Sequence, residues 1–139
     1  MDEENAAKLC LTQYAAEVGG VSPTRRQGNA GTMWDDQVPL AVLVRSHNQV
    51  VGGLIGKFFF NWLDAELIWI EKPFRRSGIG KAVLLKAEEK ARDLGLTGIY
   101  LWTQSWQASE YYSKLDYQRF AEINNFPPGH KRLGFRKYL

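Results

Sequence analysis

The spacing of apolar and polar residues changes along this 139-residue chain, and each spacing predicts a type of secondary structure. Between residues 38 and 71 the apolar residues form three short runs, separated by turn-like residues at 47–48 and 61–63. Runs of this length between turn residues are typical of strands. The predicted strands are 38–46, 49–60 and 64–71. Because short turns join them, we expect an antiparallel meander.

The following segment has a helical spacing instead. In "RRSGIGKAVLLKAEEKARDLG" (75–95) apolar residues recur every three or four positions, and Gly95 is a favourable end for a helix. The apolar residues are Ile79, Ala82, Val83, Ala87, Ala91 and Leu94. The other predicted elements are a helix over 2–18, a loop over 19–37, a strand over 97–103, a helix over 107–115, and strands over 117–124 and 131–139.

The predicted order is helix, three strands, helix, strand, helix and two strands. This order is typical of an α+β or mixed α/β domain around one twisted sheet. The length suits a single domain over residues 1–139, and the chain has no internal repeat or linker that would divide it.

Composition narrows the class of protein. The single cysteine, Cys10, excludes an intrachain disulfide, no apolar stretch is long enough to span a bilayer, and the acidic start is unlike a secretory signal. We therefore expect a cytoplasmic protein without a membrane partner. The net charge of +3 is spread over dispersed basic residues, and the two histidines and one cysteine lack the spacing of metal ligands. We expect neither a nucleic-acid partner nor a metal.

Two glycines stand where the central helix has to begin, in the pattern Arg75-x-x-Gly78-x-Gly80. The first N–H groups of a helix have no intrahelical partners, and glycine lets a phosphate approach them closely. Ala82 and Val83 exclude a Walker A loop and a dinucleotide fingerprint, respectively. The pattern favours a phosphate-binding loop, and the competing interpretation is that the glycines only permit a tight turn.

Two further stretches accompany this loop. "QASEYYSKLDYQRF" follows after one helix and one strand, and "FPPGHKR" precedes the last strand. Together, over residues 38–139, these segments resemble the GNAT superfamily of acyl-CoA-dependent N-acetyltransferases. Three departures stand out: Asp116 replaces a glycine, Gln107 stands where many relatives carry asparagine, and the chain opens with a predicted helix. The first strand of the fold is therefore expected to be absent or replaced.

The resemblance implies a mostly antiparallel sheet with a central splayed strand pair, flanking helices, and acetyl-CoA as co-substrate. The implied reaction is direct transfer of the acetyl group to a primary amine of a small molecule or peptide. The alternative is a catalytically inactive CoA-binding module that serves as a sensor or a partner subunit. A homodimer is also implied, and the aromatic stretch "FFFNW" is one candidate interface.

By the same resemblance, backbone N–H groups from about Arg76 to Ala82 hold the pyrophosphate. The N–H of Ile68 or Ile70 polarises the thioester carbonyl, and the pantetheine arm pairs with the backbone near Ile70. The implied cofactor residues are Ile68, Ile70, Arg75, Arg76, Ser77, Gly78, Ile79, Gly80, Lys81, Ala82, Gln107, Tyr112 and Lys114.

The resemblance assigns Tyr112 as the general acid for the leaving thiolate, with Tyr111 as its alternative and a packing role as the competing interpretation. Strand alternation is expected to place Asp64 and Glu66 on the face of Ile68 and Ile70. Either carboxylate is then a candidate base, and we favour Glu66 because it lies one pleat nearer the thioester. Alternatively, both are simply exposed carboxylates near a turn.

The acceptor pocket is expected to come from the loops at 19–37, 61–64 and 125–130, because binding residues concentrate on loops. Trp34 and His130 are the candidate substrate contacts. Trp69 and Trp102 are predicted to be core residues rather than pocket walls.

Overall fold

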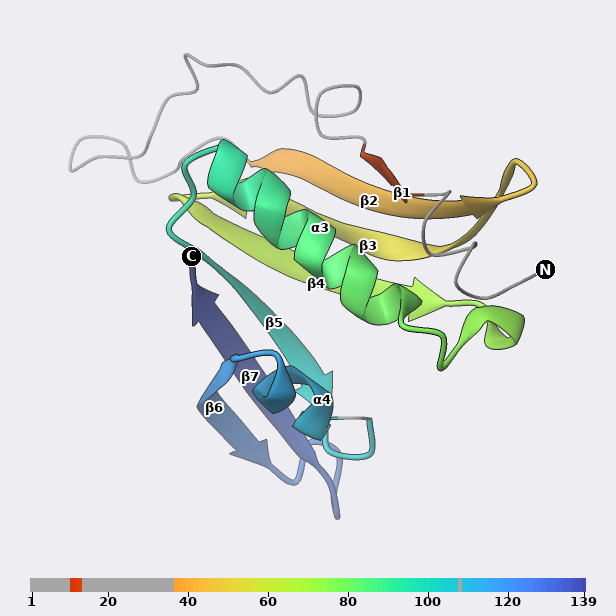
Figure 1. Cartoon of the computed structure of the whole chain (residues 1–139). Coiled ribbons are helices and arrows are strands. Elements are labelled where there is room, and N and C mark those ends of the chain that lie inside the picture. Colours follow the sequence, from red (N-terminus) through yellow and green to blue (C-terminus); the bar gives the residue numbers. More distant parts are fainter. Residues whose placement is uncertain (1–10, 14–36, 108) are drawn as a thin grey trace.

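The computed structural model describes residues 11–13, 37–107 and 109–139, and these form one seven-stranded sheet with helices against it (Figure 1). The strand order is β1-β2-β3-β4-β5-β7-β6. Only β4 and β5 run parallel, and every other neighbouring pair is antiparallel. The predicted α+β class and mostly antiparallel sheet are therefore confirmed.

The elements are β1 (Leu11–Gln13), β2 (Val38–Ser46), β3 (Gln49–Phe59), β4 (Trp62–Ile70), the 3₁₀ helix η1 (Lys72–Phe74), α3 (Ile79–Asp93), β5 (Gly98–Gln104), α4 (Ser109–Lys114), β6 (Gln118–Asn124) and β7 (Lys131–Tyr138). From residue 38 onward their types and order agree with the sequence prediction, apart from the short helix η1, which was not predicted. None of the helices in the described part of the chain is both long and apolar enough to span a bilayer.

The predicted helix over 2–18 is wrong at β1. Leu11, Thr12 and Gln13 pair antiparallel with Val44, Leu43 and Val42 of β2. The outer edge of β2 presents a row of backbone groups that need partners, and this pairing outweighs a helical preference of the local sequence. The sheet therefore has a strand before β2. Cys10 and the other residues of the predicted helix lie outside the described ranges.

Helix α3 lies across one face of β2, β3 and β4, as Figure 1 shows. Its apolar stripe packs against alternate residues of these strands, such as Val42 and Leu54, and forms the core with them. The buried apolar residues of the helix are Ile79, Val83, Leu84, Ala87 and Ala91. We call the surface of the sheet that carries α3 the helix face, and the opposite surface the far face.

One buried charge lies within this stripe. Glu88 is 0% exposed and accepts hydrogen bonds from the Tyr117 hydroxyl and the Lys137 ammonium, both at 2.9 Å. Arg92 lies 3.7 Å from the same carboxylate. Burial and the neighbouring Glu88 raise the pKa of Tyr117 well above its usual value. These contacts connect α3 to β7 and to the turn that precedes β6.

The sheet divides between its two central strands. β4 and β5 pair only from Trp62–Asp64 to Gly98–Tyr100, and beyond that point the two strands diverge (Figure 1). β5 stays paired with β7 along its full length. The predicted splayed strand pair is confirmed, and a gap opens between β4 and β5.

Candidate active site

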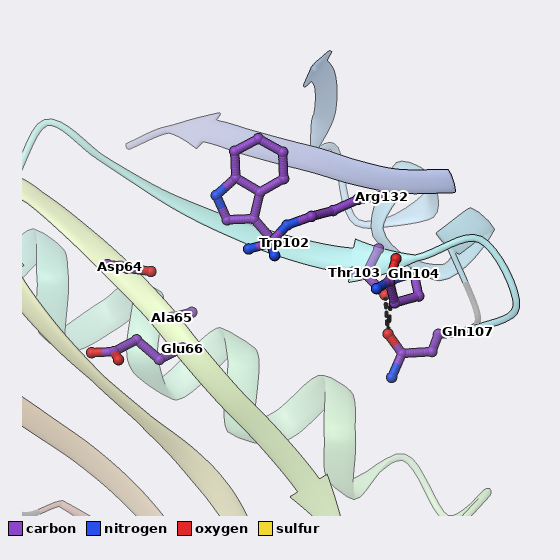
Figure 2. A pocket seen from close by; sticks show the side chains of 8 residues that line it. All are labelled: Asp64, Ala65, Glu66, Trp102, Thr103, Gln104, Gln107 and Arg132. Carbon is purple, nitrogen blue, oxygen red and sulfur yellow. Dashed lines mark hydrogen bonds between the residues drawn. The ribbon is translucent and has the colours of Figure 1, made fainter. Parts of the chain in front are cut away.

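Two cavities reach the gap from opposite faces of the sheet. The helix-face cavity, of about 200 Å³, is lined by Leu67, Ile68, Leu101, Tyr111 and Tyr112 in addition to shared residues. The far-face cavity, of about 370 Å³, is lined by Asp64, Gln104 and Arg132 in addition to the same shared residues (Figure 2). Five residues line both: Ala65, Glu66, Trp102, Thr103 and Gln107. The gap is therefore accessible from both sides.

A bulge in β4 decides which side chains point to which cavity. Ile55 pairs with Leu67 and Gly56 pairs with Ala65, so Glu66 is an extra residue without a partner on β3. The bulge reverses the alternation of the side chains: before it Ala65 packs in the core, and after it Ile68 does. Asp64 therefore points to the far face. The prediction that Asp64 shares a face with Ile68 and Ile70 is wrong.

The two carboxylates have different surroundings. The Tyr100 hydroxyl donates a hydrogen bond to Asp64, the residue with which it pairs across β4 and β5. Burial raises the pKa of Asp64, and the neighbouring Glu66 raises it further. The pKa of Tyr100 rises to about 12, because of burial first and the carboxylate second. Glu66 is half-exposed and lies 3.8 Å from the Lys57 ammonium.

The backbone of β4 offers hydrogen-bond groups to the gap. The N–H of Glu71 donates to the carbonyl of Val51 on β3, so the alternation of backbone groups turns the N–H of Ile70 and of Ile68 away from β3. The Ile70 carbonyl, on the same side, accepts a hydrogen bond of 2.7 Å from Arg75 Nε. The N–H groups of Ile68 and Ile70 thus face the gap, as the predicted roles require.

The loop before α3 is held by local contacts. Ser77 Oγ donates to the Phe74 carbonyl, Arg76 has a φ of 62°, and Gly78 has a φ of 83° immediately before the helix. The N–H of Ala82 already donates to the Gly78 carbonyl at 3.1 Å. The free N–H groups of the predicted phosphate loop therefore precede Ala82.

The glycines of this loop leave its backbone open to a ligand. A Cβ atom on Gly78 would meet no atom within 4 Å, and one on Gly80 would meet only Tyr111 Oη at 3.4 Å. That hydroxyl is buried and has no hydrogen-bond partner in the described residues. Open backbone beside an unsatisfied hydroxyl is suited to a ligand with acceptor oxygens.

Tyr112 lies on α4 and lines the helix-face cavity, against the rings of Phe135 and Tyr117. Burial raises its pKa, so the phenol keeps its proton at neutral pH. Asp116, which replaces the usual glycine, has a φ of 70° in the turn after α4. The substitution therefore lies in a turn, and Asp116 lines neither cavity.

Gln107 fixes the end of β5. Its side-chain oxygen accepts hydrogen bonds from Thr103 Oγ1 at 2.8 Å and from the Gln104 N–H at 2.9 Å (Figure 2). It lines both cavities, whereas Lys114 is exposed at the end of α4 and lines neither. Lys114 is thus not brought to the gap with the other predicted cofactor residues.

Of the two predicted substrate contacts, the structure describes only His130, and it does not lie at the gap. The ring of His130 packs against Trp106, with centroids 4.8 Å apart, and lines neither cavity. Trp34 lies outside the described residues. Trp102 was predicted to be a core residue, but it forms a wall of both cavities, and Trp69 is likewise outside the core cluster.

Arg132 is a site residue that the sequence analysis missed. Its guanidinium lies 4.9 Å from the centre of the Trp102 ring, in the far-face cavity (Figure 2). The alternation of apolar residues along β7 could have identified it. Leu133 and Phe135 are core residues of this strand, so Arg132 is placed on the opposite face of the sheet.

Comparison with known proteins agrees with this geometry. Residues 12–117 match the acetyltransferase (GNAT) family. The chain is 33% identical over 82 residues to blasticidin-S acetyltransferase of Streptomyces morookaense, a match that covers 58% of this chain and 60% of that protein. It resembles the structure of an acetyltransferase from Bacillus cereus with a TM-score of 0.73 and 25% identity, over 86% of this chain and 80% of the other. A Bacillus anthracis structure in complex with acetyl coenzyme A shares the fold, with a TM-score of 0.65 and 22% identity, over 73% of this chain and 62% of that one.

Proposed function

Because the chain belongs to the GNAT family of acetyltransferases, we propose that it transfers the acetyl group of acetyl-CoA to a primary amine of a small molecule. The observation that carries this proposal is the pair of cavities on opposite faces of the sheet that share the residues of the gap. A thioester entering from the helix face and an amine entering from the far face would meet between β4 and β5. Family membership supports the predicted enzyme class and the use of acetyl-CoA.

The residues on the helix face would hold the cofactor. N–H groups of the loop from Arg76 to Lys81 would bind the pyrophosphate at the positive end of the α3 dipole. The N–H groups of Ile68 and Ile70, which face the gap, would pair with the pantetheine arm and polarise the thioester carbonyl. Gln107, which follows β5, lines the helix-face cavity and would form its wall at that end of the gap.

Acetyl-CoA supplies the acetyl group as a thioester. The amine nitrogen forms the new bond to the carbonyl carbon, the carbon–sulfur bond breaks, and Tyr112 would donate its phenolic proton to the leaving sulfur. The raised pKa of Tyr112 suits a donor, because the hydroxyl stays protonated until the thiolate forms. The products are an amide and free CoA.

The incoming ammonium has to lose a proton before it attacks. Glu66 lines both cavities, which supports it as the group that accepts this proton through water. Asp64 lines only the far-face cavity, and would bind the ammonium there. Its raised pKa makes it a competing base, so the two assignments require separate variants.

Release of free thiol from acetyl-CoA in the presence of a broad panel of amines tests the proposal. We expect release that requires both an amine and the hydroxyl of Tyr112. If CoA binds but no amine promotes release, the alternative function is correct and the chain is a CoA-binding module. The homodimer remains a proposal as well, and within "FFFNW" the side chain of Phe58 is buried in the core and does not contribute to it.

A further inference from the structure

We propose that the acceptor carries a carboxylate in addition to its amine, and that Arg132 binds this carboxylate in the far-face cavity. The inference rests on the proposed function, because it names the substrate class of the same site. It would make the acceptor a small amino carboxylate.

The two walls of the far-face cavity carry opposite charges. Asp64 and Glu66 lie on β4, and Arg132 extends from β7 beside Trp102, on the β5 side (Figure 2). A ligand with only an ammonium would pair with the carboxylates on β4 and leave the guanidinium on the opposite wall without an anionic group to bind. A ligand with both charges satisfies both walls and is held in one orientation.

Arg132 is available for such a ligand. It forms no ion pair with another residue of the described ranges, whereas its neighbour Lys131 pairs with Glu122 at 3.2 Å. Its guanidinium lies over two rings, 4.9 Å from the centre of Trp102 and 5.4 Å from that of Phe126.

Contact with two rings orients the planar edge of the guanidinium before any ligand arrives. Less conformational freedom is then lost on binding, and the fork of N–H donors matches the two oxygens of a carboxylate. The cavity of about 370 Å³ lies near the lower end of the volumes of small-molecule sites, about 300–1,000 Å³. These features favour a small amino carboxylate over a bulky or purely cationic amine.

The test is binding to the whole chain saturated with CoA, so that turnover is not required. Calorimetric titrations compare α- and ω-amino acids with the matched amines that lack the carboxylate, such as lysine with cadaverine and phenylalanine with phenethylamine. We expect at least one amino acid to bind about tenfold or more tightly than its matched amine, the size expected for a hydrogen-bonded charge. In Arg132→Met, which keeps an apolar stem against the two rings, this preference should disappear.

Lys131→Met is the matched control, because it removes the same charge from the adjacent residue, which lines neither cavity. It should keep the preference. Circular dichroism checks that both variants fold, and a misfolded Arg132→Met is replaced by Arg132→Gln. The inference is wrong if no amino acid binds more tightly than its amine, or if the preference survives in the folded Arg132 variant. Arg132-dependent binding without any amine-dependent thiol release would overturn the proposed function alone.

Discussion

Replacement of Gly80 by valine should separate cofactor binding from folding. A Cβ at this position meets only Tyr111 Oη, at the ordinary contact distance of 3.4 Å, so the free protein has room for a Cβ here. Valine has a higher helix propensity than glycine by about 0.3 kcal/mol. The melting temperature Tm of the free protein should therefore change by no more than about 2 °C.

The ligand-induced stabilisation should behave differently. At 100 times its Kd, acetyl-CoA adds about 2.7 kcal/mol to the free energy of unfolding, or roughly 10 °C in Tm for a domain of this size. The branched side chain of Gly80→Val fills the space above the loop that the phosphate needs. If the affinity falls 100-fold, the same concentration of acetyl-CoA adds only about 0.4 kcal/mol, or about 2 °C.

Thermal melts with and without acetyl-CoA measure the Tm of the free protein and the shift in Tm that the ligand causes. Gly95→Ala is a control that should lower the first and leave the second unchanged. Gly95 has a φ of 73° after α3, and a Cβ added there would meet no atom within 4 Å, so alanine introduces backbone strain without a clash. This strain of about 1 kcal/mol should lower the Tm of the free protein by about 4 °C and leave the ligand-induced shift intact. A full shift in Gly80→Val would refute the assignment of the loop to the cofactor.

Four further predictions concern the gap and the core. Tyr112→Phe should lower kcat about 10²- to 10⁴-fold while acetyl-CoA still raises the Tm, and unchanged kcat in a rate assay would assign this residue to packing. Glu66→Gln should slow transfer in a manner that higher pH partly restores. Asp64→Asn should keep most of its kcat at saturating amine, with a higher KM for the amine, and the reverse result would exchange the two roles. The raised pKa of Asp64 means that the folded state holds this proton more tightly than the unfolded state, and the associated stability is lost as the pH rises through the folded pKa. In melts from about pH 4 to 8, Asp64→Asn should thus gain Tm relative to the wild type as the pH rises. Lys137→Met should lower the free energy of unfolding by about 3 kcal/mol in denaturant titrations, because it removes a partner of the buried Glu88 carboxylate. A loss below about 1 kcal/mol would show that Tyr117 and Arg92 are enough to stabilise this carboxylate.

The sequence predicted the elements after residue 37 because their apolar spacing is long and regular and their turns are short. It misplaced Asp64 because a single extra residue, Glu66, reverses the alternation of β4 without any change in residue type that would mark it. Trp102 was misassigned for a related reason: an apolar pattern does not reveal that two strands separate and expose a ring between them. The pairing of β1 depends on the edge of β2, which a local helical preference does not take into account.

The short ladder between β4 and β5 makes the sheet V-shaped, with two parts joined at one end and separated at the other. Its apex is the three-residue pairing that ends at Asp64 and Tyr100, and its arms are the half-sheet that carries α3 and the hairpin of β6 and β7 with β5. The Lys137–Glu88 contact ties the arms together near the apex, since Lys137 pairs with Ile99, which pairs with Leu63 on β4. A small rotation at the apex becomes a larger displacement at the mouth, where the two cavities share their lining residues. The width of the mouth thus depends in part on Lys137 and Glu88, which line neither cavity.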